Sequence, residues 1–139
     1  MAWLIYAFAS AVTAAATAIL AKIGVEGVPS TLATAFRTTI VLVIAWTLVL
    51  ALGERQALMA MPRRSWIFLS LSGVATGLSW LAYFRALQLG PASSVAPIDK
   101  LSLAVTVILA VVFLGEAWTW KTIAGVGLMI AGAIVATRP

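Results

Sequence analysis

Apolar residues fill almost the whole chain in five stretches of about twenty residues each, and the polar residues are concentrated between them. A hydrocarbon core roughly 30 Å thick needs about twenty helical residues to cross it. Inside that core, backbone polar groups must be hydrogen-bonded within the helix itself. The pattern therefore predicts an all-α, polytopic membrane protein with five transmembrane helices. The expected spans are residues 2–21, 31–52, 65–87, 95–114 and 118–136.

Short connections with helix-stopping residues separate the predicted spans. Gly90-Pro91 divides the third stretch from the fourth, and Gly115-Glu116 divides the fourth from the fifth. Ser93 or Ser94 is a plausible N-cap of the fourth helix. A cap at Ser94 would place Pro97 in the first turn, where its missing N–H is tolerated. Because so little of the chain lies between the spans, we expect residues 1–139 to form a single transmembrane unit and no soluble domain.

The composition agrees with a membrane protein and excludes several other classes. Hydrophobic residues make up 63% of the chain and charged residues 9%, against roughly 25% charged residues in an ordinary soluble domain. The formal net charge is +5, but the nine Lys and Arg residues are scattered singly or in pairs. They form no basic block that would follow a phosphate backbone, so we expect no nucleic-acid partner.

Neither cysteine nor histidine occurs in the sequence. Their absence removes disulfides, thiolate nucleophiles, Cys/His zinc sites and imidazole acid–base chemistry. The sequence also offers no nucleophile–base set, metal-binding constellation or phosphate-cradling loop. We therefore expect a protein that is not an enzyme and that has no metal and no cofactor.

The positive residues of the connections are almost balanced between the two sides of the membrane. Four lie on the side of the N-terminus: Arg55, Arg63, Arg64 and Lys121. Three lie on the other side: Lys22, Arg85 and Arg138. The excess weakly favours a cytoplasmic N-terminus, because orientation follows the Lys and Arg count of short loops. Such a balance also allows insertion in both orientations, that is, a dual topology.

Two of the predicted helices carry polar residues along a single face. In the first helix these are Tyr6, Ser10, Thr13 and Thr17. In the third helix they are Ser72, Thr76, Ser79 and Tyr83. The two faces can line a hydrated path or a solute pocket. Alternatively, the hydroxyls bond back to their own helix and allow neighbouring helices to pack closely. The sequence leaves both interpretations open.

Small residues four positions apart occur in the third and fifth predicted helices. Gly73 and Gly77 form the first pair, and Gly127 and Ala131 form the second. Such pairs are typical of close helix–helix packing in membranes. The sequence does not say whether the contact lies within one chain or between two chains.

Four ionisable residues lie inside or near the ends of the predicted spans: Arg37, Arg85, Asp99 and Lys100. Arg37 lies about seven residues into its helix, roughly 10 Å along the axis. All four face the membrane half that is reached after an odd number of crossings, and charges at that depth should point inward and be paired. They can form a basic vestibule for anionic or zwitterionic solutes. Alternatively, the arginines reach toward lipid headgroups, and Asp99 and Lys100 form a structural pair.

Adjacent residues on a helix point about 100° apart. We therefore expect Asp99 and Lys100 to pair with other helices rather than with each other.

Trp80 precedes Tyr83 by three residues, so their side chains can form one aromatic wall beside the polar face of the third helix. Packing in the core of the helix bundle is the alternative for these two residues.

Two motifs resemble a known family. Residues 86–101 read A-x-x-x-G-P-A-S-x-V-A-P-x-x-x-L, and residues 113–116 read F-L-G-E. Together with Ala21-Lys22-Ile23-Gly24 and Arg37-Thr38, they resemble the EamA-type unit of the drug/metabolite transporter superfamily. The resemblance extends over essentially the whole chain.

The resemblance implies a multi-pass protein in the inner membrane of a bacterium or archaeon. Most relatives have ten spans made of two such units that are related by an inverted repeat. This chain has one five-span unit, which is half of such a transporter, so the resemblance implies a homodimer, most naturally an antiparallel one. Four-span multidrug exporters of the same superfamily place a membrane-embedded Glu in helix one. This chain has only hydroxyl-bearing residues there, so that antiport mechanism does not carry over.

We therefore hypothesise a secondary carrier or facilitator of small polar metabolites that are amino-acid-like or zwitterionic. Arg37, Arg85 and Lys100 would bind anionic groups, Asp99 a cation or proton, and Trp80 with Tyr83 the apolar part of the solute. The lining would be completed by Tyr6, Ser10, Thr13, Thr76 and Ser79. The alternatives are a non-transporting membrane subunit and a component of a lipid-linked-substrate flippase, each acting with a partner protein. Co-purification of a distinct protein at fixed stoichiometry favours the subunit, and a lateral groove between helices that holds an acyl chain favours the flippase.

Overall fold

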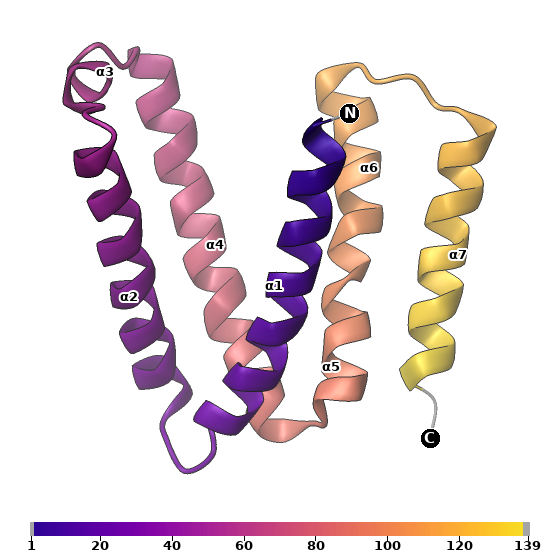
Figure 1. The fold of residues 1–139 in the computed structure, drawn as a ribbon. Coiled ribbons are helices and arrows are strands. Elements are labelled where there is room, and N and C mark those ends of the chain that lie inside the picture. The colour runs from indigo at the N-terminus through magenta and orange to yellow at the C-terminus, as the bar shows by residue number, and fades with distance from the viewer. Residues whose placement is uncertain (1, 138–139) are drawn as a thin grey trace. The chain divides into compact units, whose positions relative to one another are not determined.

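The computed structural model describes residues 2–137, which form seven helices and no strand (Figure 1). The helices are α1 (Ala2–Gly24), α2 (Ser30–Ala51), α3 (Arg55–Met59), α4 (Arg63–Leu89), α5 (Ala92–Asp99), α6 (Leu101–Leu114) and α7 (Trp120–Thr137). Arg138, which we counted among the positive residues of the connections, lies outside the described residues.

Five helical segments are long and apolar enough to cross a membrane, with α5 and α6 together forming one of them. Their bounds agree with the predicted spans to within a few residues, so the prediction of an all-α membrane protein with five spans is confirmed. Large apolar side chains along the spans are mostly exposed; Phe113, for example, is 78% exposed. In water such surfaces would be unfavourable, so they must be covered by lipid or by another protein chain.

The chain divides into two compact units. The α2–α4 unit comprises Ile23–Gln88, and the α1/α5–α7 unit comprises the described residues up to Lys22 and those from Leu89 onward. Within the α2–α4 unit, α2 and α4 run side by side in opposite directions, and α3 lies in their connection (Figure 1). The left-handed turn after α2 is made by Gly53, whose φ is 71°, a value that glycine adopts without steric cost.

The buried residues of the α2–α4 unit lie in the turn before α2, in the first part of α2 and in the last turns of α4. They are Val25, Thr34, Phe84 and Leu87. Gln88 holds these segments together, because its Nε2 donates to the backbone oxygens of Val25 at 3.3 Å and Val28 at 2.6 Å. The amide thus satisfies carbonyl groups of the turn that follows α1. This end of the unit is consequently its best-packed part.

In the α1/α5–α7 unit, α7 packs against both α5 and α6. The buried residues here are the small Ala104 on α6 and Ala133 on α7, and small side chains allow helix backbones to approach closely. Lys22, in the last turn of α1, donates from Nζ to the backbone oxygen of Gly90 at 3.1 Å. This bond connects the end of α1 to the turn before α5.

The fourth span is not one continuous helix as we predicted. Pro91 is the N-cap and α5 begins at Ala92, so the expected cap at Ser93 or Ser94 is wrong. The earlier start places Pro97 inside α5 rather than in its first turn. Proline lacks an N–H and so removes an i to i−4 hydrogen bond. The helix stops at Asp99, Lys100 takes φ −70° and ψ −9°, and α6 begins at the next residue.

The paired small residues make no close contact within their own units. A side-chain carbon added at Gly73, Gly77 or Gly127 would meet no atom within 4 Å beyond its own helix backbone and its chain neighbours. The close packing that we expected is therefore absent inside each unit. A contact with a second copy of the chain is the alternative that stays open.

Candidate functional site

Arg37 lies on the face of α2 that is turned toward α4, and its guanidinium lies over two aromatic rings of α4. Its Cζ atom is 4.3 Å from the centroid of the Trp80 ring and 5.5 Å from that of the Phe84 ring. Trp80 and Phe84 are four residues apart and so lie on one face of α4. A cation within about 6 Å of an aromatic face is attracted by the ring quadrupole, most strongly by that of Trp.

The aromatic residues around Arg37 are held by packing. Phe84 is only 3% exposed, and Trp80 and Arg37 are half-buried. Tyr83 packs edge-on against Phe84, with ring centroids 6.4 Å apart and ring planes at 74°, a favoured geometry for aromatic pairs. We call Arg37, Trp80, Tyr83 and Phe84 the Arg37 cluster.

Within the described α2–α4 unit, the guanidinium of Arg37 has aromatic partners but no acidic one. Within residues 23–88, no carboxylate forms an ion pair with it. Rings that lie over the face of a guanidinium leave the donors at its edge available, and these donors match a carboxylate or phosphate in geometry. A charge inside a membrane span costs about 2.5–3.5 kcal/mol on insertion scales. An arriving anion would offset part of that cost.

The structure changes the expected role of two aromatic residues. The sequence left open whether Trp80 and Tyr83 form one wall or pack in the core of the bundle; Trp80 lies against Arg37, and Tyr83 contacts Phe84. Phe84 itself was not among the predicted site residues. Its spacing of four from Trp80 was the available signal, because two aromatic residues at that spacing share a helix face.

Arg85 does not take part in the Arg37 cluster. Its side chain is exposed, and its Nη1 donates to Oε1 of Gln88 at 3.1 Å. Because Arg85 follows Phe84 directly, it points about 100° away around α4. The glutamine that receives this bond is the one that holds the turn before α2.

Asp99 and Lys100 form an ion pair with each other, with Nζ 3.3 Å from Oδ2. Our expectation that each would pair with another helix is therefore wrong. The four-carbon stem of lysine is long and flexible enough to reach back to the preceding side chain. Lys100 is 57% and Asp99 34% exposed.

Over residues 2–137, no three Asp, Glu, His or Cys side chains gather in a group that could hold a metal ion.

Threonine hydroxyls of the two polar faces bond to their own helices. Thr13 donates to the backbone oxygens of Ala9 at 2.9 Å and Ser10 at 3.0 Å, and Thr76 donates to that of Ser72 at 2.9 Å. Bonding of the hydroxyls to their own helix is one of the two interpretations that the sequence left open.

Tyr6, Ser10 and Ser79 are exposed. Tyr6, Ser10, Thr13, Asp99 and Lys100 belong to the α1/α5–α7 unit, and the other predicted site residues belong to the α2–α4 unit.

The chain is similar to proteins that are described as transporters. The sequence profile of the EamA-like transporter family matches residues 1–138. A Sinorhizobium protein described as "Uncharacterized transporter in cobO 3'region" is 47% identical over 133 residues, which cover 96% of this chain and 94% of that protein. The relative is thus about as long as this chain. No solved structure matches.

Proposed function

Because the chain belongs to the EamA-like transporter family, we propose that it carries small polar metabolites with an anionic group, of the amino-acid-like or zwitterionic kind. It acts as a secondary carrier or facilitator in the inner membrane of a bacterium or archaeon. Family membership and five apolar spans support a multi-pass membrane transporter. The substrate class rests on the side chains within the spans.

The observation that carries this proposal is the Arg37 cluster. A guanidinium held over Trp80 and Phe84, without a carboxylate partner in its own unit, is suited to bind the carboxylate of a solute. Arg37 is therefore the primary anion site, and Arg85 and Lys100 are secondary because each already has a side-chain partner. Asp99 is the candidate for binding a cation or a proton.

The transporter works as a dimer of two copies, most naturally antiparallel. The open faces at Gly73 and Gly77 and the exposed apolar side chains leave surface for a second copy. The relative from Sinorhizobium has the same single-unit length. Alternating access then follows from rocking one copy against the other, as in transporters built from inverted repeats.

Uptake into proteoliposomes tests the site. Radiolabelled amino acids, amines and sugar phosphates are screened with the wild-type protein and with a variant that carries Ala at Arg37, Arg85, Asp99 and Lys100. Lys121→Ala is the matched control, because this exposed cation lies outside the Arg37 cluster and the Asp99–Lys100 pair. We expect the fourfold variant to lose uptake and the control to retain it. Uptake that survives all four substitutions refutes the site assignment.

The dimer is tested by cross-linking. The chain has no cysteine, so Gly77→Cys introduces a unique thiol at a position that has room for a side chain. Oxidation in membranes should give a covalent dimer, whereas the control Met59→Cys, at a residue that is 93% exposed on α3, should not. Reporter fusions at both termini then test the orientation; two orientations in one population support the antiparallel arrangement.

A further inference from the structure

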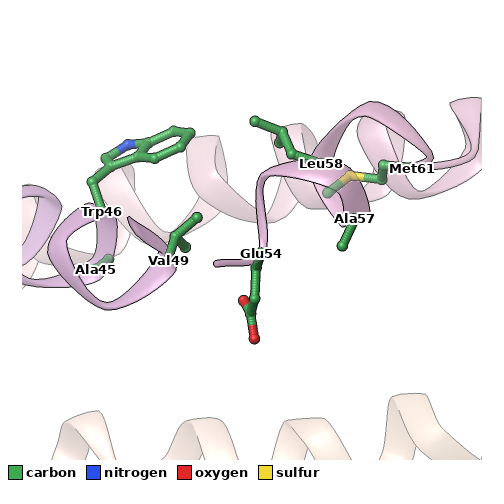
Figure 2. A pocket seen from close by; sticks show the side chains of 7 residues that line it. All are labelled: Ala45, Trp46, Val49, Glu54, Ala57, Leu58 and Met61. Carbon is green, nitrogen blue, oxygen red and sulfur yellow. The ribbon is translucent and has the colours of Figure 1, made fainter. Parts of the chain in front are cut away.

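A pocket of about 210 Å³ lies within the α2–α4 unit, where α2 ends and α3 begins (Figure 2). Its lining residues are Ala45, Trp46, Val49, Glu54, Ala57, Leu58 and Met61. Trp46 is nine residues beyond Arg37 on α2, which corresponds to about 14 Å along the helix axis. The pocket is thus separate from the Arg37 cluster.

The lining is apolar except for one carboxylate. Figure 2 shows that the Glu54 side chain points to the opposite side from those of Trp46, Val49 and Leu58. Sites for whole small molecules usually measure about 300–1,000 Å³. This pocket is smaller, so it fits one part of a larger molecule whose remainder lies outside.

The position of the pocket favours a lipid as that molecule. It lies at the end of a membrane-spanning helix, where hydrocarbon gives way to headgroups, and tryptophan is enriched at this level. An apolar lining at this depth suits the first part of an acyl chain. A polar solute would gain little from such a surface.

The charges near the pocket match a zwitterionic headgroup. Glu54, the one charged lining residue, can accept hydrogen bonds from an ammonium group. Three arginines lie close to it in the sequence: Arg55 is its neighbour, and Arg63 and Arg64 begin α4. All three are exposed, and Arg64 lies over the Phe68 ring at 5.7 Å. Guanidinium groups are well suited to bind a phosphate diester.

We propose that this pocket binds a phospholipid with a primary ammonium headgroup, that is, a phosphatidylethanolamine. The acyl chain enters between Trp46 and Leu58, Glu54 accepts the ammonium, and the neighbouring arginines bind the phosphate. The inference concerns the surrounding bilayer and does not depend on the solute that the protein transports.

Native mass spectrometry of the full chain in mild detergent tests this site. The protein is titrated with phosphatidylethanolamine, phosphatidylglycerol and phosphatidylcholine, and the bound lipid is counted. We expect the wild type to retain phosphatidylethanolamine about two- to fivefold better than the other two, the range that an exposed ion pair supports. Glu54→Gln should abolish this preference. Glu116→Gln, at an exposed glutamate outside the pocket, should keep it.

A second variant tests the acyl site independently. Ala57→Leu fills the pocket at an exposed position of α3 and should lower the retention of all three lipids. The proposal is overturned if the wild type retains the three lipids equally or prefers another one. It is also overturned if Glu54→Gln keeps the preference, or if Ala57→Leu binds as much lipid as the wild type.

Discussion

Arg37 in the α2–α4 unit and Lys100 in the α1/α5–α7 unit are both cations within membrane spans, but they are stabilised in different ways. Arg37 lies over the rings of Trp80 and Phe84 and has no carboxylate partner in its unit. Lys100 pairs with the carboxylate that precedes it in the sequence, at 3.3 Å.

Under the proposed function, this difference predicts which cation acts on a solute. An anion that approaches Lys100 must compete with Asp99, whereas one that approaches Arg37 meets donors whose charge is not yet neutralised. Aromatic rings attract a cation without adding a negative charge. They thus hold Arg37 in place and leave its charge available to the solute. Arg37 and Lys100 should consequently differ in transport and in stability.

The largest difference should appear in uptake. Arg37→Gln removes the charge but keeps an amide, and we expect it to lower the uptake efficiency roughly 10- to 100-fold, since hydrogen bonds to charged groups contribute about 1.5–3 kcal/mol. Lys100→Gln should lower it less than about fivefold, as expected for a partly exposed pair. Initial rates in proteoliposomes measure both. A larger loss for Lys100→Gln would reverse the comparison.

The next largest effect concerns the energetic coupling between each cation and the side chain that it contacts. Double-mutant cycles in detergent unfolding compare Arg37→Met with Trp80→Leu, and Asp99→Asn with Lys100→Met. We expect a coupling of about 1–2 kcal/mol for the half-buried cation–π pair and less than about 1 kcal/mol for the more exposed ion pair. Equal couplings would mean that the rings of α4 do not stabilise Arg37 more than Asp99 stabilises Lys100.

A smaller effect should follow from loosening the end of α4. Gln88→Leu removes the bonds to the oxygens of Val25 and Val28, which hold the turn before α2 against α4. We expect the KM for the solute to rise about two- to twelvefold, since a typical net hydrogen bond contributes about 0.5–1.5 kcal/mol. The coupling between Asp99 and Lys100 should stay unchanged, because both lie in the other unit. A change in that coupling would contradict this prediction.

The smallest effects belong to the threonines of the polar faces. Thr13→Val and Thr76→Val remove hydroxyls that bond to their own helices. We expect uptake to change less than about twofold, because a local back-bond contributes little to a helix. A tenfold loss for either variant would show instead that its hydroxyl contacts the solute.

The five spans could be predicted from the sequence because each depends on the average hydropathy of about twenty residues, which one or two exceptions do not change. Gly115, expected to end the fourth span, does so with φ 71° at the C-cap of α6. The break at Lys100 could not be predicted in the same way. Pro97 is tolerated or disruptive according to where the helix begins, and the sequence suggested a cap at Ser93 or Ser94 and a span from Val95, whereas α5 begins at Ala92.

Much less of the candidate site could be predicted. The sequence identified Arg37 and Trp80 as site residues but not that one lies over the other, because this depends on how α2 and α4 are paired. Phe84 was missed because its spacing of four from Trp80 becomes informative only once Arg37 is known to lie over that face of α4. The pairing of Asp99 with Lys100 was missed because helix geometry fixes the Cβ direction but not the reach of a long side chain.

The division of the fourth span into α5 and α6 has a mechanical consequence for α7. Two rigid segments joined at Lys100 can bend relative to each other, whereas α7 is a single helix that packs against both. Any change in the angle between α5 and α6 therefore requires α7 to slide along one of them or to separate from it. The resistance of the α5–α6 joint to bending therefore depends on α7, although Pro97 and the Asp99–Lys100 ion pair both lie in the fourth span.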